Sequence, residues 1–180
     1  QWYLEEGVEE LVHGLCQAFM KRGLPRSAMS DNGSAMRAAE TVQGFSRLGV
    51  HQSLTLRESP YQNGKGEAFF GQVEGRLIAM LEGVRDLDLD TLNRATLAWV
   101  EGEYQRTPHE GIEQPPLERL LAARSVGRSC PPVERLRDAF RQQVSRRQRR
   151  GDGTCSIAGV RFEIPGHYRH IERVHVRFAR

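Results

Sequence analysis

Two short segments held at a fixed separation constrain this chain more than any other feature. In the first, Asp31 follows a short extended stretch and precedes Asn32-Gly33. In the second, Glu67 follows a glycine-rich run, and 35 residues separate the two acids. Carboxylates placed at the end of a strand and the start of a helix suit Mg²⁺, which prefers oxygen ligands and is usually held by one or two carboxylates plus substrate phosphates. Two such ions can stabilise both oxygens of a phosphoryl transfer. The spacing therefore predicts metal-dependent chemistry on nucleic acid.

Hydrophobic periodicity places both acids at the ends of regular elements. The predicted order is a helix over 6–22, a strand over 26–30, a helix over 34–48 with Ser34 as its N-cap, and a strand over 50–56. Asp31 then leaves the carboxyl end of a strand, where open α/β sheets bind ligands. Glu67 falls in the first turn of a helix, where an acid also complements the helix dipole with no catalytic role. Asp90 is the expected N-cap of a later helix that buries Trp99.

These segments resemble the catalytic core of the retroviral-type integrases and bacterial insertion-sequence transposases that carry an Asp, Asp, Glu triad. The resemblance covers roughly residues 6–121. Its motifs are Arg22-Gly23-Leu24-Pro25, Ser30-Asp31-Asn32-Gly33-Ser34, Ser59-Pro60-Tyr61-Gln62-Asn63-Gly64-Lys65-Gly66-Glu67, and Tyr104-Gln105-x-x-Pro108-His109 followed by Gln114-Pro115-Pro116-Leu117. The resemblance implies an RNase H-like core in which Asp31 is the second acid and Glu67 the third, with Mg²⁺ or Mn²⁺ as the cofactor.

The first acid of that triad has no counterpart here. In the family it lies on the opening strand of the core, before the second Asp. Residues 1–30 contain no Asp and offer only four glutamates, Glu5, Glu6, Glu9 and Glu10, on a predicted helix. The chain also begins with Gln1. We therefore expect an α/β fragment, an RNase H-like core truncated at its N-terminus, without its first strands and one metal ligand.

Charge is distributed unevenly along the chain. Residues 1–123 hold 12 Lys and Arg against 18 acids, whereas residues 124–180 hold 14 Arg against 5 acids. Such asymmetry is a hint of nucleic-acid contact, because neutralisation of phosphates by Lys and Arg dominates that kind of affinity. A solvated basic surface explains the asymmetry equally well, so charge alone leaves both interpretations open.

Certain side chains are candidates for contact with DNA, because they lie beside the predicted metal site or in the basic segment. They are Tyr61, Lys65, Arg76, Arg141, Arg146, Arg147, Arg149 and Arg150. Contacts to phosphates fix the register of a protein on DNA without reading its sequence. No target sequence follows from these residues.

The remainder of the chain predicts two further regions. Residues 124–134 are rich in Gly and Pro, and Val133–Arg150 is helical in composition and strongly basic. Period-two patterns over 156–164 and 174–178, with a turn at Pro165-Gly166, predict strands. These strands resemble the start of the small β-barrel in phage Mu type transposases. The predicted domains are a partial catalytic core over 1–123, a basic helical linker over 124–151 and a partial β-barrel over 152–180.

Two functions remain open at this point. The first is DNA transposition or integration by metal-dependent nicking and strand transfer, and the second is DNA binding by a non-catalytic remnant. The resemblance implies DNA ends and target DNA as partners, and a homo-oligomer in the full-length protein. No apolar run approaches the length of a membrane span. Three widely spaced cysteines give no disulfide framework, which favours a reducing, bacterial cytoplasm.

Overall fold

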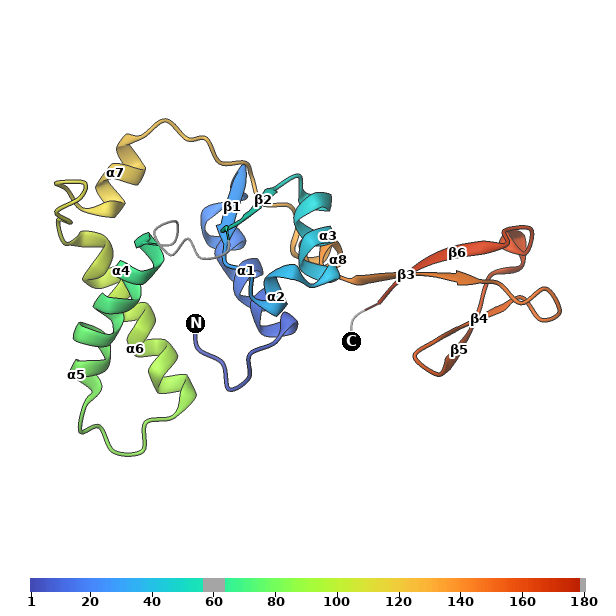
Figure 1. Ribbon diagram of the computed structural model, residues 1–180, viewed down its shortest axis with the longest axis horizontal. Coiled ribbons are helices and arrows are strands. Elements are labelled where there is room, and N and C mark those ends of the chain that lie inside the picture. The colour runs from blue at the N-terminus through green and yellow to red at the C-terminus, as the bar shows by residue number, and fades with distance from the viewer. Residues whose placement is uncertain (57–63, 179–180) are drawn as a thin grey trace.

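A computed structural model describes residues 1–56 and 64–178, and it has three parts along its length (Figure 1). A central part contains a small sheet and its helices, a helical part lies on one side, and a β part projects from the other. The elements of the central part are α1 (Val8–Arg22), β1 (Ser27–Ser30), α2 (Ser34–Arg37), α3 (Ala39–Leu48), β2 (His51–Leu54) and α8 (Val133–Ala139). No helix of the described residues is both long and apolar enough to cross a membrane.

The sheet of the central part is a parallel pair. β1 and β2 are in register from Ser27 opposite His51 to Ser30 opposite Leu54. The pairing continues past the strands, because the amide of Thr55 donates to the carbonyl of Ser30 at 2.9 Å. Since the strands are parallel, both carboxyl ends lie at the same edge of the sheet. Asp31 follows β1 at that edge, and the chain leaves β2 there towards Glu67.

Aromatic rings join α1, α3 and α8 into the first hydrophobic core. Phe45 is edge-on to Phe19, with ring centroids 6.3 Å apart, and to Phe140, with centroids 6.1 Å apart. All three rings are buried, and Leu136 of α8 is 0% exposed. Gly44 allows this packing, because a Cβ at that position would lie only 2.1 Å from Cδ1 of Phe140. Phe140 and α8, which lie beyond the catalytic core predicted over 1–123, therefore pack tightly against α3.

The helical part has its own core. It contains α4 (Gly64–Gln72), a π-helical segment η2 (Val73–Ile78), α5 (Ala79–Leu81), α6 (Leu89–Gly102), η3 (Tyr104–Arg106) and α7 (Pro116–Ala122). Val73, Leu77 and Trp99 form the buried centre. The burial of Trp99 confirms the sequence prediction. Trp2 connects the N-terminal segment to α6, since its indole Nε1 donates to Oγ1 of Thr96 at 2.7 Å.

The β part is made of a ribbon and a hairpin. β3 (Gln142–Arg147) pairs antiparallel with β6 (Arg173–Phe178), and β4 (Thr154–Ile157) pairs antiparallel with β5 (Val160–Glu163), while η4 (Gly166–Tyr168) precedes β6. One face of the ribbon packs on a core of Cys155, Ile157 and Ile164.

Two predicted elements of this region were wrong. The helix predicted over Val133–Arg150 ends at Ala139, because the next residues form β3 and find their backbone partners in β6, far along the chain. The strand predicted over 156–164 is a hairpin. Its two-residue turn, Ala158-Gly159, has φ of 48° and 82°, which is the geometry that tight hairpins require.

Two predicted caps were also wrong. The helix predicted over 34–48 breaks at Ala38, whose ψ of 145° is extended, and Gly33 rather than Ser34 precedes its first turn. At the start of α6, the cap is Asp88 rather than Asp90, because Oδ1 of Asp88 accepts the amide of Thr91 at 2.7 Å. Asp90 lies inside the helix and pairs with Arg94 at 2.9 Å.

Candidate metal and nucleic-acid site

Asp31 lies in a turn that is fixed at the carboxyl edge of the sheet. Its Oδ1 accepts the amide of Gly33 at 2.9 Å. The side chain of Asn32 donates through Nδ2 to the carbonyl of Thr55 at 2.6 Å, which ties the turn to the end of β2. The Asp31 side chain is exposed, and among the described residues only its Oδ1 has a hydrogen-bond partner. The second carboxylate oxygen is therefore available to a ligand.

Glu67 lies in the first turn of α4, as predicted. Its side chain is exposed and forms no ion pair or hydrogen bond with the residues that the structure describes. The chain runs from the carboxyl end of β2 to α4 through residues 57–63, which lie outside the described residues. Both acids thus follow strands that end at one edge, and neither is neutralised by a nearby cation in residues 1–56 and 64–178.

The donors at the candidate site are two carboxylates, the oxygen ligands that Mg²⁺ prefers. In the described part of the chain, no group of three or more His, Cys, Asp or Glu side chains is arranged to hold a metal. An ion shared by Asp31 and Glu67 would take its other oxygens from water or substrate phosphates, which is the usual way in which Mg²⁺ is bound.

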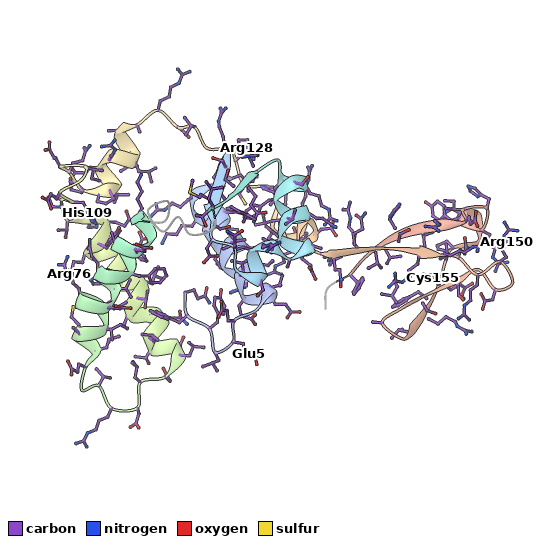
Figure 2. The ribbon with its side chains drawn as sticks, in the orientation of Figure 1. Glu5, Arg76, His109, Arg128, Arg150 and Cys155 are labelled. Carbon is purple, nitrogen blue, oxygen red and sulfur yellow. The ribbon has the colours of Figure 1, made fainter. Side chains whose placement is uncertain are left out.

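The candidates beside the predicted metal site differ in their surroundings. Lys65 is exposed in the first turn of α4, two positions before Glu67. Arg76, labelled in Figure 2, forms an ion pair with Glu103 that joins η2 to the end of α6. Its charge is therefore engaged within the protein. Tyr61 lies outside the described residues.

The basic candidates of the β part do not share one surface. Arg141 pairs with Asp138 at 3.4 Å, and Arg147 pairs with Glu172 at 2.7 Å. Because side chains alternate along a strand, Arg146 and Arg147 point to opposite faces of β3, and Nε of Arg146 donates to the carbonyl of Ser156 at 3.2 Å. Arg149 and Arg150 are exposed beyond the strand. The single basic helix expected to carry these residues is not present.

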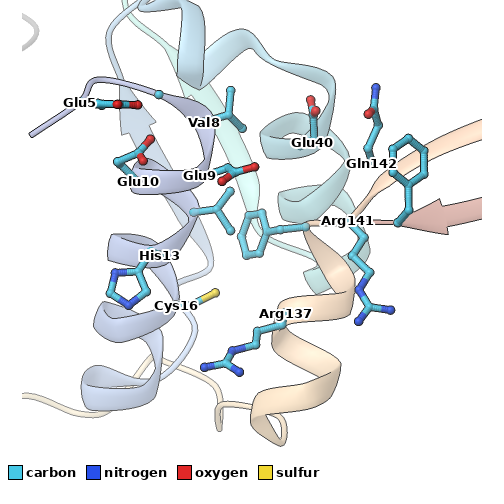
Figure 3. A pocket seen from close by; sticks show the side chains of 14 residues that line it. Glu5, Val8, Glu9, Glu10, His13, Cys16, Glu40, Arg137, Arg141 and Gln142 are labelled. Atoms are coloured by element: carbon cyan, nitrogen blue, oxygen red, sulfur yellow. The ribbon is translucent and has the colours of Figure 1, made fainter. Parts of the chain in front are cut away.

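Two cavities among the described residues lie away from the two acids. One of about 470 Å³ opens between α1, α8 and the start of β3, and Phe140 is among the residues that line it. Figure 3 shows Val8 and Cys16 on α1, with the acids Glu9 and Glu40 nearby. Burial raises the pKa of the Cys16 thiol. A second cavity of about 810 Å³ lies between α1 and α6. Neither cavity is lined by Asp31 or Glu67.

Sequence analysis missed several basic side chains that the fold brings to one face of the β3–β6 ribbon. Arg173, His175 and Arg177 occupy alternate, exposed positions of β6. At the base of the ribbon, burial lowers the pKa of the Arg47 guanidinium, and the nearby charge of Arg177 lowers it further. The period-two pattern over 174–178 contained this signal. A helix over Val133–Arg150 leaves β6 without β3 as its partner, so that prediction does not place these residues on a ribbon face.

Comparisons with known proteins bear on the fold. No protein-family model matches the chain, and none of the curated proteins matches it. Among solved structures, a chain of the simian T-cell lymphotropic virus intasome, solved in complex with the PP2A regulatory subunit B56 gamma, matches with a TM-score of 0.55 and 16% identity, over 88% of this chain and 52% of that one. The catalytic core domain of BIV integrase matches with a TM-score of 0.51 and 20% identity, over 68% and 76%. The fold is integrase-like.

A further match to the integrase-like fold has a lower score. It is the HTLV-2 integrase catalytic core domain in complex with magnesium, with a TM-score of 0.49 and 20% identity, over 63% of this chain and 70% of that one. The present chain spans about half of the intasome chain that it matches. At such identities the likeness concerns the fold alone. The mixed order of helices and strands is consistent with an RNase H-like core.

Proposed function

We propose that this chain acts in DNA integration or transposition, and that Asp31 and Glu67 together bind the divalent ion, Mg²⁺ or Mn²⁺, of a phosphoryl-transfer site. The observation that carries the proposal is the sheet edge itself. An exposed acid is fixed after β1, the chain leaves the same edge from β2 towards a second exposed acid, and the fold around them is integrase-like. The proposed activity includes transposition of the kind that bacterial insertion-sequence transposases carry out.

Different residues of the chain would hold the metal-binding acids in place and contact the DNA. The hydrogen bonds of Gly33 and Asn32 hold the Asp31 turn before any ion arrives. Lys65 offers a cation beside Glu67 for a DNA phosphate, and the Arg76–Glu103 ion pair steadies the helix that carries Glu67 against α6. A bound divalent ion would supply stabilisation of the charge that develops on the phosphoryl oxygens.

The domain organisation belongs to the same proposal. We assign residues 1–123 to the catalytic core, 124–151 to a basic connecting segment and 152–180 to a partial β-barrel. Packing of α8 on α3 through Phe140 gives the connecting segment a firm attachment to the core. The ribbon begins within this segment, because β3 follows α8 directly and pairs with β6.

Metal binding provides the direct test of the proposed site. Titration with Mn²⁺, followed by calorimetry, should show that Asp31→Asn and Glu67→Gln each weaken binding by more than about tenfold, since even loss of a residue that merely supports a metal ligand has an effect of that size. Glu74→Gln removes an exposed acid from η2, which directly follows α4, and serves as the matched control. Equal Mn²⁺ affinity in all four proteins would refute the site.

The second candidate function is DNA binding without chemistry. It is favoured by the excess of cations beyond residue 123, where the sequence holds 14 Arg and only 5 acids. Duplex DNA incubated with the protein and Mn²⁺ separates the two functions. Salt-sensitive binding without cleavage would support the second. Cleavage that Asp31→Asn and Glu67→Gln abolish would support the first.

A further inference from the structure

One face of the β3–β6 ribbon is entirely polar. The register sets Arg147 opposite Arg173, Ser145 opposite His175 and Gln143 opposite Arg177. Because side chains alternate along a strand and directly opposed residues share a face, these six residues lie together. We call them the cationic ribbon face. The other face carries Val144, Val174, Val176 and Phe178, which pack against the core of the hairpin.

The charges of the cationic ribbon face are only partly neutralised within the protein. Like charges placed directly opposite each other destabilise a sheet, and Arg147 and Arg173 are such a pair. Glu172 pairs with Arg147, whereas Arg173 forms no ion pair with any of the described residues. At the other end, Arg177 donates to Asp138 at 3.1 Å and to Oε1 of Gln143 at 3.0 Å. An excess of positive charge therefore remains on the face, and an anionic ligand would relieve the repulsion.

The shape of the ribbon limits which anion fits. The ribbon projects from the central part, and β4 and β5 lie beside it (Figure 1). Since the apolar face is covered by that hairpin, the cationic ribbon face is the one left open to a partner. Guanidinium forks match the oxygens of phosphate, and a two-stranded β-ribbon is of a size that the major groove of duplex DNA admits. A long polymer with regularly spaced phosphates can contact several of the opposed residue pairs of the ribbon at once.

We infer that the cationic ribbon face binds the phosphate backbone of double-stranded DNA, with Arg147 and Arg173 as its main contacts. This inference rests on the proposed function in taking DNA as the partner, but it places the DNA contact on residues remote from Asp31 and Glu67. It also differs from the expected basic helix. Arg146 points to the opposite face, so Arg146 does not take part, whereas Arg173, His175 and Arg177 do.

Fluorescence anisotropy with a labelled duplex, over about 50 to 200 mM salt, tests the inference. Each lost phosphate contact should reduce the slope of log K against log salt by about 0.9. The double variant Arg147→Gln/Arg173→Gln should therefore lose about 1.8 from the slope. Arg85→Gln/Arg124→Gln removes the same charge from exposed residues outside the ribbon and should leave the slope nearly unchanged. Arg147→Lys/Arg173→Lys, which keeps the charge, should keep most of the slope.

Folding is checked separately in the same proteins. Removal of two opposed arginines should leave the thermal midpoint without DNA unchanged or raise it, since an exposed ion pair such as Arg147–Glu172 contributes little. The inference is overturned if both glutamine double variants lower the slope equally, or if the ribbon variant binds as the original protein does. The second of these outcomes leaves the metal site untouched, because Mn²⁺ binding reports on that site independently. Absence of salt-dependent binding by the original protein would overturn the inference together with DNA as the proposed partner.

Discussion

Replacement of Gly44 by Ala tests the packing that attaches the segment beyond residue 123 to the core. A Cβ on Gly44 would lie 2.1, 2.5 and 2.8 Å from ring atoms of Phe140, whereas ordinary contacts are 3.4–4 Å. The ring must therefore move by more than about 1 Å in a core where overpacking costs about 1–3 kcal/mol. Ala in place of Gly returns about 1 kcal/mol in a helix interior. The net loss of unfolding free energy should be about 0–2 kcal/mol.

The same substitution should change sign once the ring is removed. Phe140→Ala alone should cost about 3–5 kcal/mol. In that background the new methyl group enters vacated space, so Gly44→Ala should stabilise by about 1 kcal/mol. Urea unfolding of the four proteins gives the coupling free energy, which we expect to be about 1–3 kcal/mol. Gly71→Ala, in α4 with no atom within 4 Å of its Cβ, is the control and should stabilise. Additivity within about 0.5 kcal/mol would refute the packing of α8 on α3.

Other features of the fold give further predictions. Hydrogen bonds to Thr91 lower the pKa of the Asp88 carboxyl. The stability that this carboxylate contributes is therefore present above its unfolded pKa and is lost as pH falls through its folded pKa. Asp88→Asn should flatten that part of the curve of unfolding free energy against pH, and an unchanged curve would contradict this. Ala158→Gly should stabilise the protein by about 0.5–1 kcal/mol in urea unfolding, because Ala158 has a φ of 48°; a loss of stability would argue against the hairpin turn. Because burial raises the pKa of Cys16 and the reactive form is the thiolate, iodoacetamide should modify the half-buried Cys130 before Cys16 in the native protein, as peptide mass analysis would show.

Local patterns predicted the parts of the fold that depend on nearby residues. Helical spacing over 6–22 found α1, the apolar repeat placed Trp99 in a core, and the glycine-rich run placed Glu67 in a first turn. The N-cap of α6 was not fixed by the local pattern, because two nearby acids can each accept a hydrogen bond from the first turn. Asp88 and Asp90 are both suited to the role, and backbone geometry favours Asp88.

Non-local pairing explains the main failures. Nothing within Val133–Arg150 shows that residues after Ala139 pair with a strand that begins at Arg173. Arg146 and Arg147 lie on opposite faces because they are neighbours in a strand, an arrangement that a predicted helix does not give. For the candidate metal site, hydrophobic periodicity predicted the strand end at Asp31 and the helix start at Glu67. The proposed metal site also requires that Asp31 and Glu67 lie close together, which is a non-local property.

Fe²⁺ bound in place of Mg²⁺ tests most directly whether one ion touches both acids. With ascorbate and peroxide, the bound iron releases hydroxyl radicals that cut the backbone beside it, and the fragments are read by mass spectrometry. We predict cuts near both Asp31 and Glu67, suppressed together by excess Mg²⁺. Cuts near only one of the two acids, or cuts that Mg²⁺ does not suppress, would contradict a shared metal site.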